Sequence, residues 1–208
     1  MSISIRNFGR GHNAATNTYA VTVMTCTGQS VAAKVHGIRA DGSQYTVDFS
    51  AGKYFKSEEA TFNDLPGLLK IITEAATDPK QFILRGRLRN DAPVKGDDLV
   101  RRTSRVQHGG EEPYFENIDR AWVMIDFDKV ANPEGLKPTS VAAMKYMRAL
   151  LPPTFHGVEC VYSLSASAGL TNSRMISGYL WFILDRPVFH QELKAWLSNF
   201  PVDKALFL

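Results

Sequence analysis

The segment at residues 122–128, WVMIDFD, limits the fold of this chain more than any other stretch. Four apolar residues are followed by two acids, Asp126 and Asp128, with one residue between them. Side chains alternate between faces along a β-strand, so a strand here would place both carboxylates on one face. Because carboxylates are costly to bury without a partner, they need either solvent or a cation beside them. The segment therefore predicts a buried strand that ends in two acids on the same side.

This acid pair allows two interpretations. Hard oxygen ligands suit Mg²⁺ or Mn²⁺ rather than zinc, so Asp126 and Asp128 are candidate ligands of a divalent cation. Alternatively, the strand simply runs out into solvent with two exposed acids. The segment by itself favours neither interpretation, because short acid-x-acid patterns are common.

The composition is that of an ordinary folded protein. The 208 residues are 44% hydrophobic and 22% charged, which excludes disordered, collagen-like and coiled-coil classes. The net charge of +3 is too small to indicate a nucleic-acid or membrane partner unless the charges cluster. We expect Cys26 and Cys160 to be reduced thiols of a cytoplasmic protein. The sequence shows no apolar run of membrane-spanning length and no signal-peptide core at its N-terminus.

Strand and helix patterns are mixed along the chain. Alternating or apolar runs predict strands at residues 19–25, 31–38, 44–49, 82–88, 121–125, 158–165 and 178–184. Apolar residues at helical spacing predict three helices, which begin near Asp64, Ser140 and Phe189. The polar stretch at 89–117 predicts a long loop of functional or mobile character. This order predicts an α+β or α/β sheet covered by helices.

Two further stretches contain residues that commonly contact phosphate. Guanidinium groups bind phosphate oxygens in pairs, and six arginines fall within 21 residues. They are Arg85, Arg87, Arg89, Arg101, Arg102 and Arg105. A continuous strand would place the first three on one face. The segment 162–169, YSLSASAG, has small hydroxyl residues after a predicted strand, where hydroxyls and backbone amides can approach phosphate. A solvated basic face and a flexible turn are the alternative interpretations.

Taken together, these segments resemble the catalytic domain of archaeo-eukaryotic primases, in particular the primase–polymerases of phages and plasmids, over roughly residues 20–208. The family's first motif, an apolar strand ending in acid-x-acid, is matched at 123–128. Its second, a small-x-His strand followed by an apolar run and Asp-Arg-Pro, is matched at 177–187, SGYLWFILDRP, with Tyr179 at the histidine position. Its third, an apolar residue plus an acid, is matched by Val202 and Asp203. The stretch from Ser163 to Gly169 is similar to the family's Ser-x-Ser-x-Gly run.

The resemblance implies a fold and an activity. The fold would be α+β, with mixed or antiparallel sheets flanked by helices in a primase–polymerase core of the RRM-like type. It would occupy residues 19–208, after a flexible stretch at 1–18. The activity would be DNA-dependent nucleotidyl transfer from a nucleoside triphosphate to a 3′-hydroxyl, in the replication of a phage, plasmid or other mobile element. Because the chain ends on mostly apolar residues, we expect it to be the N-terminal part of a longer protein.

The resemblance also implies site residues and partners. Two Mg²⁺ or Mn²⁺ ions would be held by Asp126, Asp128 and Asp203. Candidate nucleotide-binding residues are Ser165, Ser167, Arg174 and Tyr179. Candidate nucleic-acid-binding residues are Arg85, Arg87, Arg101, Arg102 and Arg105. The implied partners are single-stranded DNA template and primer, nucleoside triphosphates and a helicase, on the same chain or separate, in the cytoplasm of a bacterial, archaeal or phage-infected cell. No membrane partner is implied.

Tyr179 departs from the family pattern and leaves alternatives open. The family histidine is implied to contact the triphosphate, whereas tyrosine donates a hydrogen bond but is uncharged at neutral pH. Either Tyr179 serves in a variant active site, with Arg174 or a loop arginine supplying charge, or the domain is a weakened or inactive module that binds nucleotide and nucleic acid. A third reading is a haloacid-dehalogenase-like phosphatase with Asp126 as nucleophile. Against it, about 120 residues precede the motif, and no later paired acids with a suitable lysine occur.

Overall fold

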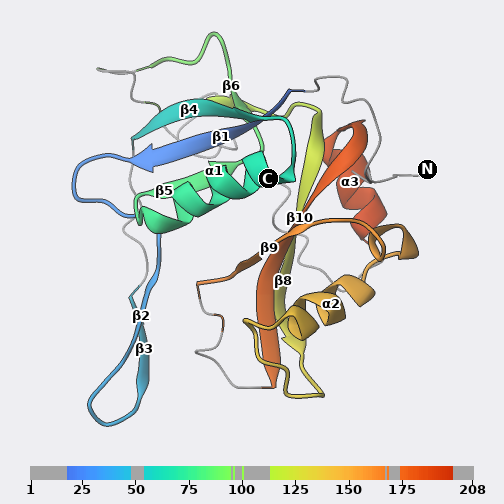
Figure 1. The fold of residues 1–208 in the computed structure, drawn as a ribbon. Helices are drawn as coiled ribbons and strands as arrows, with labels where there is room; N and C mark the ends of the chain where they lie inside the picture. The colour runs from blue at the N-terminus through green and yellow to red at the C-terminus, as the bar shows by residue number, and fades with distance from the viewer. Residues whose placement is uncertain are drawn as a thin grey trace. The chain divides into compact units, whose positions relative to one another are not determined.

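The computed structural model describes residues 18–47, 54–94, 96, 100, 113–166, 168 and 174–198 of the chain. These residues divide into two compact units, and Figure 1 shows the elements of each. The first, which we call the N-terminal unit, is built from residues 18–37 and 45–118. The second, the C-terminal unit, contains residues 38–44 and the rest of the described chain from residue 119 onward. Every described strand pair is antiparallel, and three α-helices are present in the described residues, so the expected α+β class is confirmed.

The N-terminal unit is organised around a three-stranded sheet and one helix. Its elements are β1 (Tyr19–Cys26), β4 (Phe55–Phe62), α1 (Leu65–Thr77), β5 (Gln81–Leu84), β6 (Arg87–Leu88) and β7 (Phe115–Glu116). Strand β1 lies at the centre of the order β4-β1-β5, and β6 pairs with β7. Helix α1 begins after Asp64, whose carboxylate accepts a hydrogen bond from the Gly67 N–H at 2.8 Å, as the sequence predicts. A separate hairpin is formed by β2 (Val35–Ile38) and β3 (Gln44–Val47).

The C-terminal unit is a three-stranded sheet with helices on one face. Its elements are β8 (Arg120–Ala131), α2 (Val141–Ala149), the short 3₁₀-helix η1 (Pro153–Phe155), β9 (Val161–Leu164), β10 (Met175–Val188) and α3 (His190–Leu197). The strand order is β8-β10-β9, and β10 is the central strand. Apolar side chains from β8 and β10 pack with those of α2 and α3 in one core. This core contains Val123, Ile125, Phe127, Ala143, Met147, Leu180, Phe182, Leu184, Leu193 and Leu197.

One predicted strand is interrupted in the structure, so that prediction is wrong. Residues 82–88 were expected to form a single strand, but the chain forms β5 and β6, which pair with different partners, β1 and β7. The break falls at Arg85 and Gly86. There the Thr22 hydroxyl donates to the Gly86 carbonyl at 2.6 Å, so this carbonyl is satisfied outside any strand ladder. The expectation that one strand presents Arg85, Arg87 and Arg89 on a single face therefore fails.

The thiols agree with the sequence-based expectation. Cys26 and Cys160 are both free, and burial raises the pKa of each thiol above its ordinary value. Both are therefore protonated and weakly reactive near neutral pH. Among the described helices, none combines the length and the apolar character that crossing a membrane would require.

Candidate active site on the β8–β10–β9 sheet

Asp126 and Asp128 lie on the face of the sheet opposite to the one that α2 and α3 cover. Their neighbours in β8, Ile125 and Phe127, are fully buried in the helical core. Asp126 itself is half-buried and Asp128 is exposed. The alternation that the sequence predicts is therefore present, but the strand continues past the acids as far as Ala131. The two carboxylates consequently sit along the sheet rather than in a loop beyond it.

A row of polar side chains crosses the sheet at Asp126. Tyr179 on β10 is paired with Asp126 on one side and with Ser163 of β9 on the other. Directly paired residues of antiparallel strands point to the same face. Burial, together with the charges of Asp126 and Asp128, raises the pKa of Tyr179 from 10.0 to about 12. Tyr179 therefore keeps its proton throughout the physiological range and offers an O–H donor next to two carboxylates.

Asp128 lies in a β-bulge. Phe127 pairs with Gly178 and Val130 pairs with Ile176, so β8 has one more residue than β10 between these pairs. Asp128 and Lys129 thus both face the single residue between Gly178 and Ile176. Lys129 has φ 52°, in the left-handed region that side-chain-bearing residues seldom adopt. Bulges of this kind redirect side chains and often occur beside active sites.

Two tryptophans extend the same face beyond the polar row. Trp122 of β8 and Trp181 of β10 are 2% and 5% exposed, and their ring centroids are 5.9 Å apart. The Trp181 indole N–H donates to the Ser163 hydroxyl at 3.0 Å. This bond fastens β9 to β10 just before the chain enters the connection between them. It thereby helps to fix the start of the serine-rich segment that sequence analysis associated with phosphate.

Ser165 and Arg174 lie at the two ends of the β9–β10 connection. Ser165 directly follows β9, and its carbonyl accepts a hydrogen bond from the Ala168 N–H at 3.0 Å. Arg174 directly precedes β10, is exposed, and accepts a hydrogen bond at its carbonyl from the Asn132 N–H at 2.7 Å. Both residues are at the end of the sheet toward which Asp128 lies. The predicted residues Ser167 and Asp203 lie outside the described residues.

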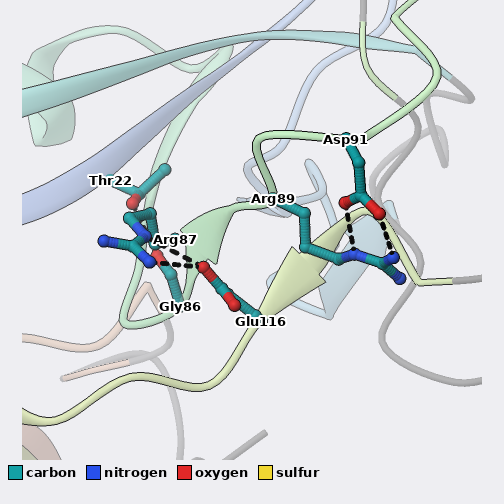
Figure 2. A network of polar contacts seen from close by, with 6 residues as sticks. All are labelled: Thr22, Gly86, Arg87, Arg89, Asp91 and Glu116. Carbon is teal, nitrogen blue, oxygen red and sulfur yellow. Dashed lines mark hydrogen bonds and ion pairs between the residues drawn. The ribbon is translucent and has the colours of Figure 1, made fainter.

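Two of the clustered arginines are engaged within the N-terminal unit, as Figure 2 shows. Arg87 donates from Nε and Nη2 to one carboxylate oxygen of Glu116, at 3.0 and 2.6 Å. Arg89 donates to both carboxylate oxygens of Asp91, at 2.9 and 2.7 Å. The hydrogen bond to Glu116 raises the pKa of Arg87, and the one from Arg89 lowers the pKa of Asp91. Each pair cancels much of the charge that a phosphate would meet.

The remaining predicted nucleic-acid contacts divide between the described and undescribed parts of the chain. Arg85 lies at the break between β5 and β6, in the same unit as Arg87. Arg101, Arg102 and Arg105 lie outside the described residues. Within the part that the structure describes, the basic patch thus consists of arginines that are largely held by acids of their own unit.

The donor set on β8 suits a hard divalent cation. Over the described ranges, no three His, Cys, Asp or Glu side chains come together as a metal site would require. Mg²⁺, however, commonly takes only one or two carboxylates from a protein, and water and substrate phosphates complete its shell. Asp126 and Asp128 supply that number of oxygen ligands on one face. The chemistry of this pair therefore fits the share of ligands that a protein commonly gives to Mg²⁺ or Mn²⁺.

Comparisons with protein-family models, with curated proteins and with solved structures found no significant match to this chain. Membership of the primase family therefore remains a prediction that rests on the motifs described above. The geometry of the β8–β10–β9 sheet has to support any functional proposal by itself.

Sequence reasoning assigned no site role to Trp181 or to Lys129 in the bulge. It placed Ser163 in the hydroxyl-rich segment but did not predict its bond to Trp181. The bulge does leave a trace in the sequence. Apolar core positions fall at 123, 125 and 127 and then at 130, so the period of two slips by one residue. That slip is the signal that could have located it.

Proposed function

We propose that this chain is a DNA-dependent nucleotidyltransferase, a primase–polymerase that acts in the replication of a phage, plasmid or other mobile element. We include in the proposal the RRM-like core of that family. The observation that carries it is the pair of carboxylates, Asp126 and Asp128, on one face of an antiparallel sheet with the neutral hydroxyl of Tyr179 directly beside them. The single-stranded template, its primer and a nucleoside triphosphate are the proposed substrates.

Each residue has a role that its chemistry permits. Phosphoryl transfer depends mainly on positioning and on stabilisation of negative charge. Asp126 and Asp128, joined by Asp203, would hold two Mg²⁺ or Mn²⁺ ions. Such ions, when bound, activate the attacking hydroxyl and neutralise charge on the triphosphate. The carboxylates fix where these charges lie, so they determine where the reacting oxygens must be.

Around the acids, neutral and cationic donors would bind the triphosphate. Tyr179 donates a hydrogen bond without adding charge. Ser165 and Ser167 supply hydroxyl donors from the β9–β10 connection. Arg174, at the other end of that connection, supplies a guanidinium that can hold two phosphate oxygens at once. Template and primer phosphates would be held by Arg85, Arg101, Arg102 and Arg105, and Arg87 would have to leave Glu116 to join them.

A primer-extension assay with Mg²⁺ or Mn²⁺ tests this proposal directly. Wild type should extend a primed single-stranded template, and Asp126→Asn should reduce the rate on the order of a hundredfold or more. Asp119→Asn is the matched control. It makes the same chemical change at an exposed aspartate just before β8, far along the strand from the candidate site. No synthesis by wild type with either metal, or equal rates for wild type and Asp126→Asn, would contradict the proposal.

A second candidate function is a nucleic-acid- and nucleotide-binding module without catalysis. Tyr179 favours it, because a tyrosine hydroxyl, unlike a histidine ring, has no cationic form and so brings no positive charge to a triphosphate. This reading expects DNA binding that survives Asp126→Asn, and no synthesis by wild type. Tyr179→His is informative for both readings, since it restores the side chain of the family motif. A gain in primer extension by this variant would show that tyrosine limits a working active site.

The phosphatase alternative assigns a different role to the same residue. Asp126 would attack a phosphate ester itself, with no need for a nucleic acid. A colorimetric phosphatase assay on the wild-type protein distinguishes it from both other functions. Phosphate release that Asp126→Asn abolishes, without any primer extension, would favour the phosphatase.

A further inference from the structure

Ser177 is the residue of β10 that faces the bulge at Asp128 and Lys129, and its hydroxyl bonds to both. The Lys129 backbone N–H donates to Ser177 Oγ at 3.0 Å. The same hydroxyl donates to Asp128 Oδ1 at 3.4 Å, a long hydrogen bond. Ser177 is only 5% exposed, although Asp128 itself is open to solvent. One buried hydroxyl therefore links the irregular backbone of β8 to the outer carboxylate.

This arrangement distinguishes Asp128 from Asp126. Asp126 is half-buried in a regular part of the strand pair, directly opposite Tyr179, so its neighbours restrict it. Asp128 is exposed and follows no regular pairing, so its side chain would otherwise turn freely. A metal-binding carboxylate requires a defined orientation, and partners outside the ligand set commonly provide it. Ser177 is in the position to do so.

We propose that Ser177 is a positioning residue that orients the Asp128 carboxylate for a divalent cation held jointly with Asp126. This inference rests on the proposed function, because it assumes that the acid pair binds Mg²⁺ or Mn²⁺. It adds that the bulge is part of the site. The hydrogen bond from Lys129 holds the Ser177 oxygen as an acceptor, which directs the hydroxyl proton away from the backbone and toward Asp128.

A purely structural role for Ser177 makes a different prediction. If the hydroxyl only satisfied the Lys129 N–H, its removal would lower stability but leave metal affinity unchanged. The loss of this one hydrogen bond costs only a fraction of the stability of a typical domain. We therefore expect Ser177→Ala to fold and to differ from wild type chiefly in its affinity for metal.

The test is a titration of the full chain with Mn²⁺ alone, with free Mn²⁺ followed by electron paramagnetic resonance. We expect Ser177→Ala to bind about tenfold more weakly than wild type, at the lower end for such partners because the bond to Asp128 is long. Ser177→Thr, which keeps the hydroxyl, should recover most of the affinity. Ser198→Ala is the matched control, since it removes a hydroxyl that donates, among the described residues, to the Ala195 carbonyl of its own helix. Its affinity should equal that of wild type.

Two variants separate failure of this inference from failure of the proposed function. Asp126→Asn should abolish Mn²⁺ binding. If it does, and Ser177→Ala binds as wild type does, the positioning role is overturned while the metal site stands. If wild type binds no Mn²⁺, or Asp126→Asn binds it normally, the metal site is refuted and the positioning role with it. Should Ser177→Ala fail to fold, Ser177→Cys, a weaker donor of similar size, replaces it, and wild-type affinity in that variant would overturn the inference.

Discussion

Replacing Gly178 with alanine is expected to destabilise the C-terminal unit, because the added methyl group has no room. A Cβ atom at this position would lie 2.9 Å from Tyr162 Cε2 and 3.1 Å from the Ser163 carbonyl oxygen. Non-bonded carbon atoms normally stay about 3.5–4.0 Å apart, so the ring or the strand must move. Both are held in place. Ser163 lies in β9, which pairs with β10, and the Tyr162 hydroxyl donates to the Pro138 carbonyl at 2.6 Å.

The size of the effect follows from these contacts. Overpacking a tight site costs about 1–3 kcal/mol, and displacing the Tyr162 ring would forfeit a hydrogen bond worth about 1 kcal/mol. Alanine restricts the unfolded chain more than glycine does, which offsets about 0.4–1 kcal/mol. The expected net loss in the free energy of unfolding is about 1–3.6 kcal/mol. That is a large part of the roughly 5–15 kcal/mol that stabilises a typical domain.

Denaturant unfolding followed by tryptophan fluorescence measures this loss. All three tryptophans of the chain, at positions 122, 181 and 196, belong to the C-terminal unit, so their emission reports on it. Gly157→Ala is the matched control, because a Cβ there meets nothing within 4 Å. The control should match wild type or gain up to about 1 kcal/mol, because its unfolded chain is restricted in the same way. Equal stabilities for Gly178→Ala and Gly157→Ala would refute the close packing of Tyr162 over Gly178.

Three further perturbations have defined expectations. Lys129→Gly should raise the free energy of unfolding by about 0.5–1 kcal/mol in the same assay, because glycine tolerates a positive φ. Lys129→Ala should give no gain. Equal gains from both variants would contradict backbone strain at Lys129. Phe155→Ala removes a fully buried ring from the helical core and should cost about 3–5 kcal/mol, and a loss below about 1 kcal/mol would show that this ring is not in the core. Asp126→Asn should lower the pKa of Tyr179 from about 12 but leave it above 10.0, because burial remains. Phenolate absorbance, with Tyr179→Phe as the blank, follows that titration, and an unchanged pKa would mean that the two side chains are not neighbours. In wild type, the stability due to neutral Tyr179 is complete below pH 10 and is lost as the pH rises toward 12, since the unfolded tyrosine ionises first.

Helices were more predictable from the sequence than strands, because their signals are local. Helix α1 is predicted by the capping carboxylate of Asp64, by the apolar spacing after that residue and by Pro79 just beyond the end of the helix. Strand β4 was not predicted. It is polar on most of its length, and only Phe55 and Phe62 at its ends are buried. Its strand conformation comes from pairing with β1 along eight residues, and this partner lies in another part of the sequence.

In the candidate site, too, only the features that depend on local patterns were predictable from the sequence. The position of Asp126 and Asp128 on one face needed only the alternation of a strand, and the structure has it. The alignment of β10 with β8 decides that Tyr179 pairs with Asp126. The same alignment places Ser177 opposite the bulge. No local pattern specifies that alignment. The arginine cluster was visible in the sequence, but its neutralisation was not. Glu116, the acid that binds Arg87, is 29 residues away in sequence.

The order of strands in the two sheets has a consequence for synthesis of the chain. In the β4-β1-β5 sheet the central strand is synthesised first, so each later strand can pair with it as soon as it is synthesised. In the β8-β10-β9 sheet the central strand is made last, and within the described residues β8 and β9 pair only with it. From the end of β8 at residue 131 to the end of β10 at residue 188 is 57 residues (188 − 131). Translation at about 5–20 residues per second leaves β8 without its partner for about 3–11 s.

During that interval β8 is an apolar strand with unpaired backbone groups, which can associate with other chains. Charged side chains within such a strand hinder this association. Asp126 and Asp128 would therefore protect the nascent chain before any substrate reaches it. Selection for soluble expression and selection for chemistry would then act on the same two carboxylates.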